Sequence, residues 1–237
     1  MKRLISAFVF LFFVASAFAQ KVVNDPNAEV RTVTSFHAIE LSNAFEVLLT
    51  QGGSESLAVS ASEKEDMQYI ITKVENGVLK ISFEQKHKWV PKNRKLKAYI
   101  SVKNIDALQI NGACNVKIDG TLKTASLKLN LSGASKLNGK LLVDDHFIAQ
   151  LSGASDMEIS GAAPDMKITA TGASDVKAFE FSTATCNITA SGASSVRISV
   201  DRELNATLRG ASSVSYKGNA SIKDISTSGA SSISRKS

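Results

Sequence analysis

The residue types that most often perform catalysis or bind metal are few in this chain and lie far apart. Its three histidines are His37, His87 and His146, and none is followed by a second histidine or a cysteine two to four positions later. Ligands at that spacing are typical of zinc sites, because a short element can then direct both of them at one metal ion. The sequence therefore predicts no metal site.

A second route to chemistry is a pair of carboxylates, which glycosidases use as general acid and as base or nucleophile. Asp156 and Asp175 fall at equivalent positions of a repeat, so we expect their side chains to stack in neighbouring turns. The next equivalent positions hold Ser195 and Ser213, so an acidic pair is expected but not a full site. We therefore predict a chain that is not an enzyme and needs no cofactor.

One segment concentrates cations around the only tryptophan of the chain. Its members are Lys86, Lys88, Trp89, Lys92 and Arg94. Cationic side chains attract an anionic surface, and an exposed indole adds stacking or burial. These five residues are the candidate contact site for an acidic glycan, a lipid head group or a protein. The alternative is a solvated connection whose tryptophan packs on the turn beneath it.

The elements that position these residues are set by seven copies of one short phrase, whose glycines recur about every 18 to 21 residues. The copies are Asn111-Gly112-Ala113-Cys114, Ser132-Gly133-Ala134-Ser135, Ser152-Gly153-Ala154-Ser155, Thr171-Gly172-Ala173-Ser174, Ser191-Gly192-Ala193-Ser194, Arg209-Gly210-Ala211-Ser212 and Ser228-Gly229-Ala230-Ser231. One such repeat cannot bury its apolar face alone, so the copies must stack. The pattern predicts a solenoid.

Apolar and polar residues alternate around each copy of the phrase. Before the fourth copy, Met166, Ile168 and Ala170 alternate with Lys167 and Thr169. This period of two indicates a strand with one face in the core and one in water. A shorter strand follows each copy, and no helical pattern lies between them.

The Gly-Ala pair marks a sharp corner, because glycine tolerates a positive φ. We expect the alanines to stack in one buried column: Ala134, Ala154, Ala173, Ala193, Ala211 and Ala230. The serines after them should form a ladder of hydroxyls along one edge. This ladder has two interpretations, a hydroxyl-lined binding stripe or serines that bond the local backbone of the turn.

The two cysteines, Cys114 and Cys186, are separated by four turns of the predicted stack. Strands lie about 4.8 Å apart, so four turns correspond to about 19 Å. A disulfide needs Cα atoms within about 7 Å of each other. Both cysteines are therefore expected to be small buried fillers without a bridge.

All-strand turns with small corner residues predict an all-β, single-stack, right-handed parallel β-helix. Residues 107–237 should form its regular turns, and residues 20–106 should form irregular N-terminal coils of the same domain that cap the apolar end. A leucine-rich repeat fits less well, because neither a helical segment nor a recurrent asparagine accompanies the period. We expect a short helix with a capping box of Ser62 and Glu65 among the N-terminal coils. The last turn has no evident cap, so self-association through this C-terminal edge is expected.

Residues 1–19 have the pattern of a signal peptide. Lys2 and Arg3 precede an apolar run, and Ala17-Phe18-Ala19 supplies the small residues of a cleavage site. The remaining chain has no apolar run near the roughly twenty residues of a spanning helix, so no transmembrane segment is expected after cleavage. Loss of Lys2 and Arg3 lowers the formal net charge from +6 to +4. This mild charge and the predicted export argue against nucleic acid as a partner.

Three stretches resemble a known family: Phe36 to Leu41, Phe45 to Val47 with Gln51-Gly52, and the repeated Ser-Gly-Ala-Ser. The family is described as putative auto-transporter adhesin, head GIN domain, and is common in Bacteroidetes-type bacteria. The resemblance covers about residues 30–235 and carries no catalytic residue. It implies an exported β-helix protein with a role in surface adhesion.

Two function classes follow. In the first, the protein is a noncatalytic binding or adhesion module of the bacterial cell envelope, which presents a β-helix surface to a glycan or a cell-surface protein. In the second, it is a periplasmic structural or envelope-assembly factor whose exposed end is a template for another chain. Whether the protein lies in the periplasm, on the outer surface or outside the cell separates the two.

Overall fold

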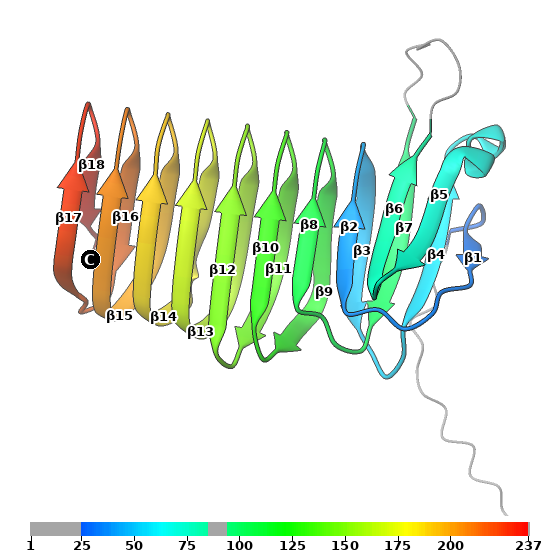
Figure 1. Ribbon diagram of the computed structural model, residues 1–237, viewed down its shortest axis with the longest axis horizontal. Helices are drawn as coiled ribbons and strands as arrows, with labels where there is room; N and C mark the ends of the chain where they lie inside the picture. Colours follow the sequence, from blue (N-terminus) through cyan, green and yellow to red (C-terminus); the bar gives the residue numbers. More distant parts are fainter. Residues whose placement is uncertain (1–24, 85–93, 237) are drawn as a thin grey trace, which may run out of the picture.

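The computed structural model describes residues 25–84 and 94–236, and strands dominate it (Figure 1). The first elements are β1 (Glu29–Arg31), β2 (Ala38–Leu41), β3 (Phe45–Gln51), β4 (Ser56–Ala61), the 3₁₀ helix η1 (Lys64–Tyr69), β5 (Ile70–Glu75), β6 (Val78–Phe83), β7 (Leu96–Val102) and β8 (Ala107–Ile110). They are followed by β9 (Asn115–Thr124), β10 (Leu127–Leu131), β11 (Lys136–Val143), β12 (His146–Leu151), β13 (Asp156–Ala170), β14 (Asp175–Ala190), β15 (Ser195–Leu208), β16 (Ser213–Lys217), β17 (Ser221–Thr227) and β18 (Ser232–Arg235).

One turn of chain, here called a rung, consists of two strands joined by a tight corner. In the rung of β10 and β11, β10 pairs in parallel with β8 and β12, and β11 pairs in parallel with β9 and β13. Each of β13, β14 and β15 is one long strand that bends and serves two successive rungs. The first half of β13, for example, pairs with β11 and its second half with β12. The predicted all-β stack of parallel strands is confirmed.

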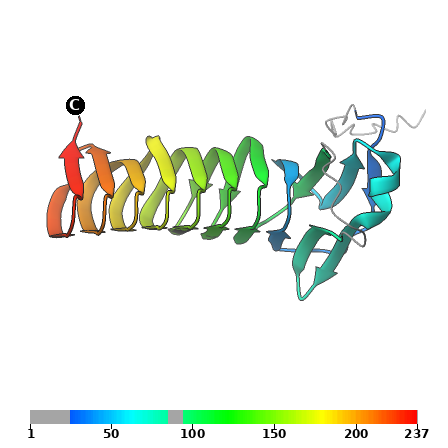
Figure 2. The same cartoon turned by 90° about the horizontal axis from the view of Figure 1, so that it is seen from above.

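The strands on the two sides of the corners form two faces, which are visible from above in Figure 2. The pre-corner face contains β2, β6, β8, β10, β12, β17 and the second halves of β13, β14 and β15. The post-corner face contains β3, β7, β9, β11, β16, β18 and the first halves of β13, β14 and β15.

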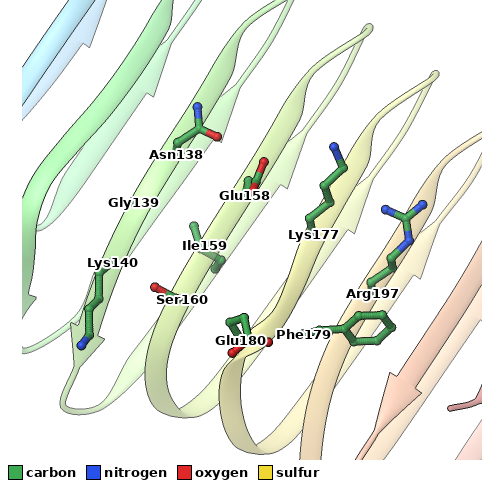
Figure 3. A pocket seen from close by; sticks show the side chains of 10 residues that line it. All are labelled: Asn138, Gly139, Lys140, Glu158, Ile159, Ser160, Lys177, Phe179, Glu180 and Arg197. Carbon is green, nitrogen blue, oxygen red and sulfur yellow. The ribbon is translucent and has the colours of Figure 1, made fainter. Parts of the chain in front are cut away.

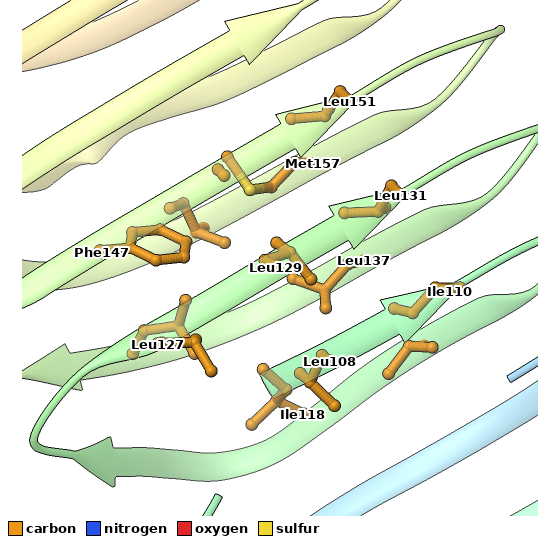
Figure 4. Packing of buried hydrophobic residues seen from close by; sticks show 14 of the residues in the cluster. Leu108, Ile110, Ile118, Leu127, Leu129, Leu131, Leu137, Phe147, Leu151 and Met157 are labelled. Atoms are coloured by element: carbon orange, nitrogen blue, oxygen red, sulfur yellow. The ribbon is translucent and has the colours of Figure 1, made fainter. Parts of the chain in front are cut away.

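Inward side chains of the two faces meet in columns that run along the solenoid (Figure 4). Ile110, Leu131 and Leu151 are register partners in successive rungs, and their exposed fractions are 0%, 1% and 2%. Burial of one such side chain contributes about 1.5–3 kcal/mol. Apolar burial therefore supplies the stability of a fold whose two cysteines are free.

The corners differ from the sequence-based expectation in which residue is buried. Glycine and alanine form the exposed tip of each corner, and the serine after them points into the core. Ala173, for example, is exposed, whereas Ser174 is buried. The predicted buried column of alanines is wrong: Ala134, Ala154, Ala173, Ala193, Ala211 and Ala230 are all exposed.

The glycine conformation explains this reversal. Gly172 has a φ of 77°, and this left-handed turn makes Ser174 the next inward position. A Cβ at Gly172 would lie 2.5 Å from the carbonyl oxygen of Gly153 in the preceding rung, so close stacking also requires glycine. The N–H of Ala173 donates to that same carbonyl at 2.7 Å. Successive corners are thus joined into a hydrogen-bonded column.

The first rungs are not stacked in chain order. β2 pairs in parallel with both β6 and β8, and β3 pairs in parallel with both β7 and β9. The rung of β2 and β3 therefore lies between two rungs that follow it in the sequence. Asn43 takes the corner position of this inserted rung, with a φ of 76° and a carbonyl that accepts the N–H of Ala113 at 2.6 Å.

Antiparallel strands cover the N-terminal end of the stack. β4 pairs with β7, β5 with β6, and β1 with β4. A short helix is present where the sequence predicts one, as the six-residue 3₁₀ helix η1, but the predicted capping box is wrong, because the N-cap is Glu63 and no side chain caps the helix. The hydroxyl of Ser62 instead accepts a hydrogen bond from the backbone N–H of Lys95 at 3.3 Å.

The C-terminal end has no such cover among the described residues. Of the described strands, β17 pairs only with β15 and β18 only with β16. All seven residues of β17 are exposed. The two ends of the solenoid are therefore unlike in structure.

Candidate functional site

A groove of about 530 Å³ lies on the post-corner face, across β11, β13, β14 and β15 (Figure 3). Its lining includes Asn138, Lys140, Glu158, Lys177, Phe179 and Arg197. The groove is open to solvent and combines charges of both signs with an aromatic ring. It is the described feature best suited to contact a partner molecule.

Four of the lining side chains come from one row of register partners. Asn138 pairs with Glu158, Glu158 with Lys177, and Lys177 with Arg197 in consecutive rungs. Each is the fifth residue after the glycine of its corner. At a strand spacing of about 4.8 Å, the row extends over about 14 Å.

An irregularity of β14 brings Phe179 to the groove. Ala178 pairs with Ile198, and the next register pair is Ser182 with Ser199. Between these two pairs β14 therefore has three residues more than β15, and they bulge outward. The hydroxyl of Ser199 donates to the carbonyl of Phe179 at 2.7 Å and holds the bulge in place. Bulges redirect side chains in this way. The half-buried ring also lies 5.2 Å from Nζ of Lys217.

One carboxylate orients two of the groove's cations. Nη1 of Arg197 is 3.4 Å from both carboxylate oxygens of Asp175, and Nζ of Lys177 is 3.8 Å from Oδ2. Within the described ranges, Glu158 and Lys140 form no ion pair or hydrogen bond through their side chains. A ligand in the groove therefore contacts two kinds of charged group. Asp175 restricts the positions of Arg197 and Lys177. Glu158 and Lys140 have no side-chain partner among the described residues.

The expected acidic pair is present but is not extended. Asp156 and Asp175 are register partners, and Ser195 and Ser213 follow them in the row. Asp175 is already paired with Arg197. The row therefore gives no converging acid and base.

The buried serines decide between the two interpretations of the hydroxyl ladder. The Oγ of Ser174 donates to the carbonyl of Thr171 at 2.8 Å, and Ser155 donates to Ser152 in the same way. The same bond, to the carbonyl three residues earlier, is formed by Ser135, Ser194, Ser212 and Ser231. Bonding of the local backbone is confirmed, and the binding stripe is wrong.

The predicted role of the cysteines as buried fillers is confirmed. Cys114 occupies the serine position of its corner, with Sγ 3.5 Å from the carbonyl oxygen of Asn111. Burial raises the pKa of the Cys186 thiol to about 12 and also raises the pKa of Cys114. Both stay protonated near neutral pH and are poor nucleophiles.

The described histidines lie at the surface beside carboxylates. Nδ1 of His37 is 2.9 Å from Asp106, and Nε2 of His146 is 3.1 Å from Asp145. His87 lies outside the described residues. Across residues 25–84 and 94–236, no group of three or more His, Cys, Asp or Glu side chains is placed to hold a metal ion.

Most of the predicted basic segment is outside the part of the chain that the structure describes, namely Lys86, Lys88, Trp89 and Lys92. Arg94 is described, and its Nε is 3.0 Å from Oδ2 of the buried Asp66. Its guanidinium also lies 5.6 Å from the ring centroid of Phe83. Arg94 is thus engaged within the chain, and partner binding by this segment stays a prediction.

The sequence matches a family model over residues 35–220, and that family is described as putative auto-transporter adhesin, head GIN domain. This match covers most of the chain. The chain belongs to this family. A comparison of this adhesin-family member with curated proteins gave no match.

Solved structures share the fold of this adhesin-family chain. A putative adhesin from Bacteroides fragilis has a TM-score of 0.80 at 20% identity, covering 88% of this chain and 96% of its own. A putative adhesin from Parabacteroides distasonis has a TM-score of 0.68 at 17% identity, with coverages of 88% and 96%. A protein of the same species described as a putative lipid binding protein has a TM-score of 0.66 at 20% identity, with coverages of 90% and 98%.

Two sequence-based predictions concern membranes and export. No helix in the described portion of this adhesin-family chain is long and apolar enough to cross a membrane. The predicted signal peptide, residues 1–19, lies outside the described residues and stays a prediction.

Sequence reasoning did not find the groove. The clearest alternation of apolar and polar residues lies in the strands before the corners, whereas the groove is lined by a row from the strands after them: Asn138, Glu158, Lys177 and Arg197. The available signal was the charged or polar fifth residue after each corner glycine. No periodic signal reveals Phe179, because its place depends on the bulge.

Proposed function

We propose that this protein is an exported, noncatalytic adhesion module of the bacterial cell envelope that binds a glycan or a protein through the groove of the post-corner face. The observation that carries this proposal is the row of polar and charged side chains beside Phe179, held on a continuous sheet. Membership of an adhesin family supports a binding role.

The chemistry of the groove favours a ligand rich in hydrogen-bonding groups. Asn138, Glu158 and Arg197 supply an amide, a carboxylate and a guanidinium, which together offer both donors and acceptors. Phe179 adds an apolar surface beside them. Sites of this composition orient a ligand by a few polar groups while the apolar surface adds burial. A chain of sugars or an extended peptide fits a row of this length.

A glycan array and a panel of envelope proteins test this function with the mature protein. The groove variants are Phe179→Ala and Lys177→Ala, and the matched control is Lys167→Ala on the opposite, pre-corner face, where Lys167 is also exposed. Each groove variant should lower binding about fivefold or more, since each removes a contact of about 1 kcal/mol. The control should bind as the unsubstituted protein does.

The basic segment is a separate candidate contact in the same assay. A triple variant, Lys88→Ala with Trp89→Ala and Lys92→Ala, is compared at low and high salt on acidic glycans and on anionic liposomes. Binding that falls with this variant and with salt, but not with the groove variants, would place the contact in the basic segment. Binding unaffected by either set would contradict the adhesion proposal.

The open last rung favours a second candidate function, a periplasmic assembly factor. Within residues 25–84 and 94–236, the outer edge of β17 pairs with no other strand, so a strand of another protein can extend the sheet there. Protease accessibility on whole cells separates the two functions. An adhesin is digested in intact cells, whereas a periplasmic factor is digested only after the outer membrane is opened.

A further inference from the structure

Inward apolar side chains of the last rung have no cover among the described residues. Ile222 and Ile225 of β17 are 40% and 42% exposed. Their register partners in β15, Leu204 and Ala206, are 0% and 3% exposed. The core columns therefore continue into β17 and end there against solvent.

The first six residues of β17 have a symmetric pattern, centred between Lys223 and Asp224. They read Ser221-Ile222-Lys223-Asp224-Ile225-Ser226. Reversal of this order leaves serine and isoleucine at the same places and exchanges lysine with aspartate. Two such strands aligned antiparallel place serine opposite serine, isoleucine opposite isoleucine and lysine opposite aspartate. Opposite charges and apolar pairs across two strands are the contacts that stabilise sheets.

A bulge in β17 makes this alignment geometrically consistent. Residues three apart in a regular strand point to opposite faces, so Ile222 and Ile225 would not meet across a two-fold axis. At this point, however, β17 has one residue more than β15. Ile222 and Ile225 are therefore both in inward positions, and Lys223 and Asp224 together lie opposite the single residue Asn205. The two-fold axis can then pass through the bulge.

We propose that a second copy of this chain binds the last rung head to head, with the two β17 strands paired antiparallel about a two-fold axis. Ile222 of each copy contacts Ile225 of the other, and this joins the two apolar cores. Lys223 of each copy pairs with Asp224 of the other. Neither Lys223 nor Asp224 has an ion-pair partner within the described part of its own chain.

The N-terminal end of the solenoid favours a closed dimer over a fibre. A head-to-tail stack would bring β17 against the N-terminal end of the next copy, where β4 and β5 pair antiparallel with the outer strands. The last rung therefore fits another last rung better than the opposite end. A contact between identical surfaces closes after two copies. This inference is independent of the groove and of its ligand.

Charge reversal at the two central residues tests the register. Asp224→Lys places lysine opposite lysine twice, and Lys223→Asp places aspartate opposite aspartate twice. Each single variant should weaken dimerisation at least about tenfold, because two attractive pairs become repulsive. An equimolar mixture of the two variants should dimerise again, since the lysines of one copy then face the aspartates of the other. Sedimentation velocity of the mature chain over a concentration series measures these dissociation constants.

Lys167→Asp is the matched control, because Lys167 is an exposed lysine of the pre-corner face away from β17. It should leave the dimer unchanged, and thermal melts establish that every variant is folded. A monomeric unsubstituted protein, or single variants that dimerise as it does, would overturn the proposal and leave the bulge and charges as protection of the edge. Weakened single variants that do not recover in the mixture would overturn the proposed register.

Discussion

At the scale of the residue, glycine and serine have different tasks in each corner. The glycine at positive φ turns the chain and lets its backbone approach the preceding rung, and the serine closes the turn from inside with a hydrogen bond. The alanine between them contributes its N–H to the column but no buried side chain. The loss in free energy of unfolding on substitution should therefore differ sharply between neighbouring residues of one corner.

Gly172→Ala should lower the free energy of unfolding by about 2 kcal/mol or more, because an L-residue at positive φ costs about 1–2 kcal/mol and the added Cβ also meets a carbonyl. Ala173→Leu, one residue later, should change it by less than about 0.5 kcal/mol, since Ala173 is exposed. Urea unfolding of both variants checks this contrast. A large loss for Ala173→Leu with little loss for Gly172→Ala would contradict the corner structure.

The position of the corners was predictable from the sequence, but their orientation was not. The recurrence of glycine marks a turn, whereas which neighbour points inward depends on the φ of that glycine, which composition does not specify. Asn43 illustrates the limit, because an asparagine replaces glycine at the corner of the inserted rung. A search for the phrase alone therefore misses this corner.

At the scale of the element, the segment before β1 is tied to β7 by Asp25. The hydroxyl of Tyr99 donates to Oδ2 of Asp25 at 2.7 Å, and Nζ of Lys97 lies 3.3 Å away. The Tyr99 hydrogen bond, with help from Asn27 and Lys97, lowers the pKa of Asp25 from 3.8 to about 2. Two chain segments far apart in sequence thus depend on one ionised carboxylate.

The stability that Asp25 supplies should be lost in acid. Its folded-state pKa is below its ordinary value, so the contribution is present above about pH 4 and disappears as pH falls through about 2. It should amount to about 1–2 kcal/mol after screening by solvent. Asp25→Asn should therefore destabilise the protein at about pH 6 and have little effect at about pH 2, as measured by urea unfolding. An equal effect at both pH values would show that Asp25 has no such role.

The regular strands were predictable because alternation of period two is strong in residues 107–237. The groove was not, since it requires register between strands and the bulge that displaces Phe179. The register between strands depends on how many residues each rung has at the bend opposite its corner. The spacing of the corner glycines gives only the total number of residues in a rung. The outward row of Glu158, Lys177 and Arg197 could thus have been predicted from its constant distance to the corner glycines. The position of the Phe179 ring beside it could not, because it depends on the bulge.

At the scale of the whole molecule, the two ends of the stack should respond differently to truncation. Removal of residues 219–237 takes away β17 and β18 and leaves β15 and β16 as the new edge, so a shorter folded protein with a lower melting temperature is expected. Removal of residues 25–102 uncovers one side of β8 and β9 and should give aggregated protein. Circular dichroism and gel filtration check both outcomes. A soluble, folded product of the second truncation would show that the N-terminal cover is dispensable.

Because the rung of β2 and β3 lies between two later rungs, its strands must wait for their partners during folding. During synthesis from the N-terminus, these strands appear before either of their neighbours exists. They gain β6 and β7 on one side first, and β8 and β9 on the other side only when residue 119 has emerged. Until then, two unpaired edges and their apolar side chains need protection from other chains. We therefore expect this protein to be most vulnerable to misassembly before the rung of β2 and β3 is paired on both sides. The later addition of regular rungs exposes it less.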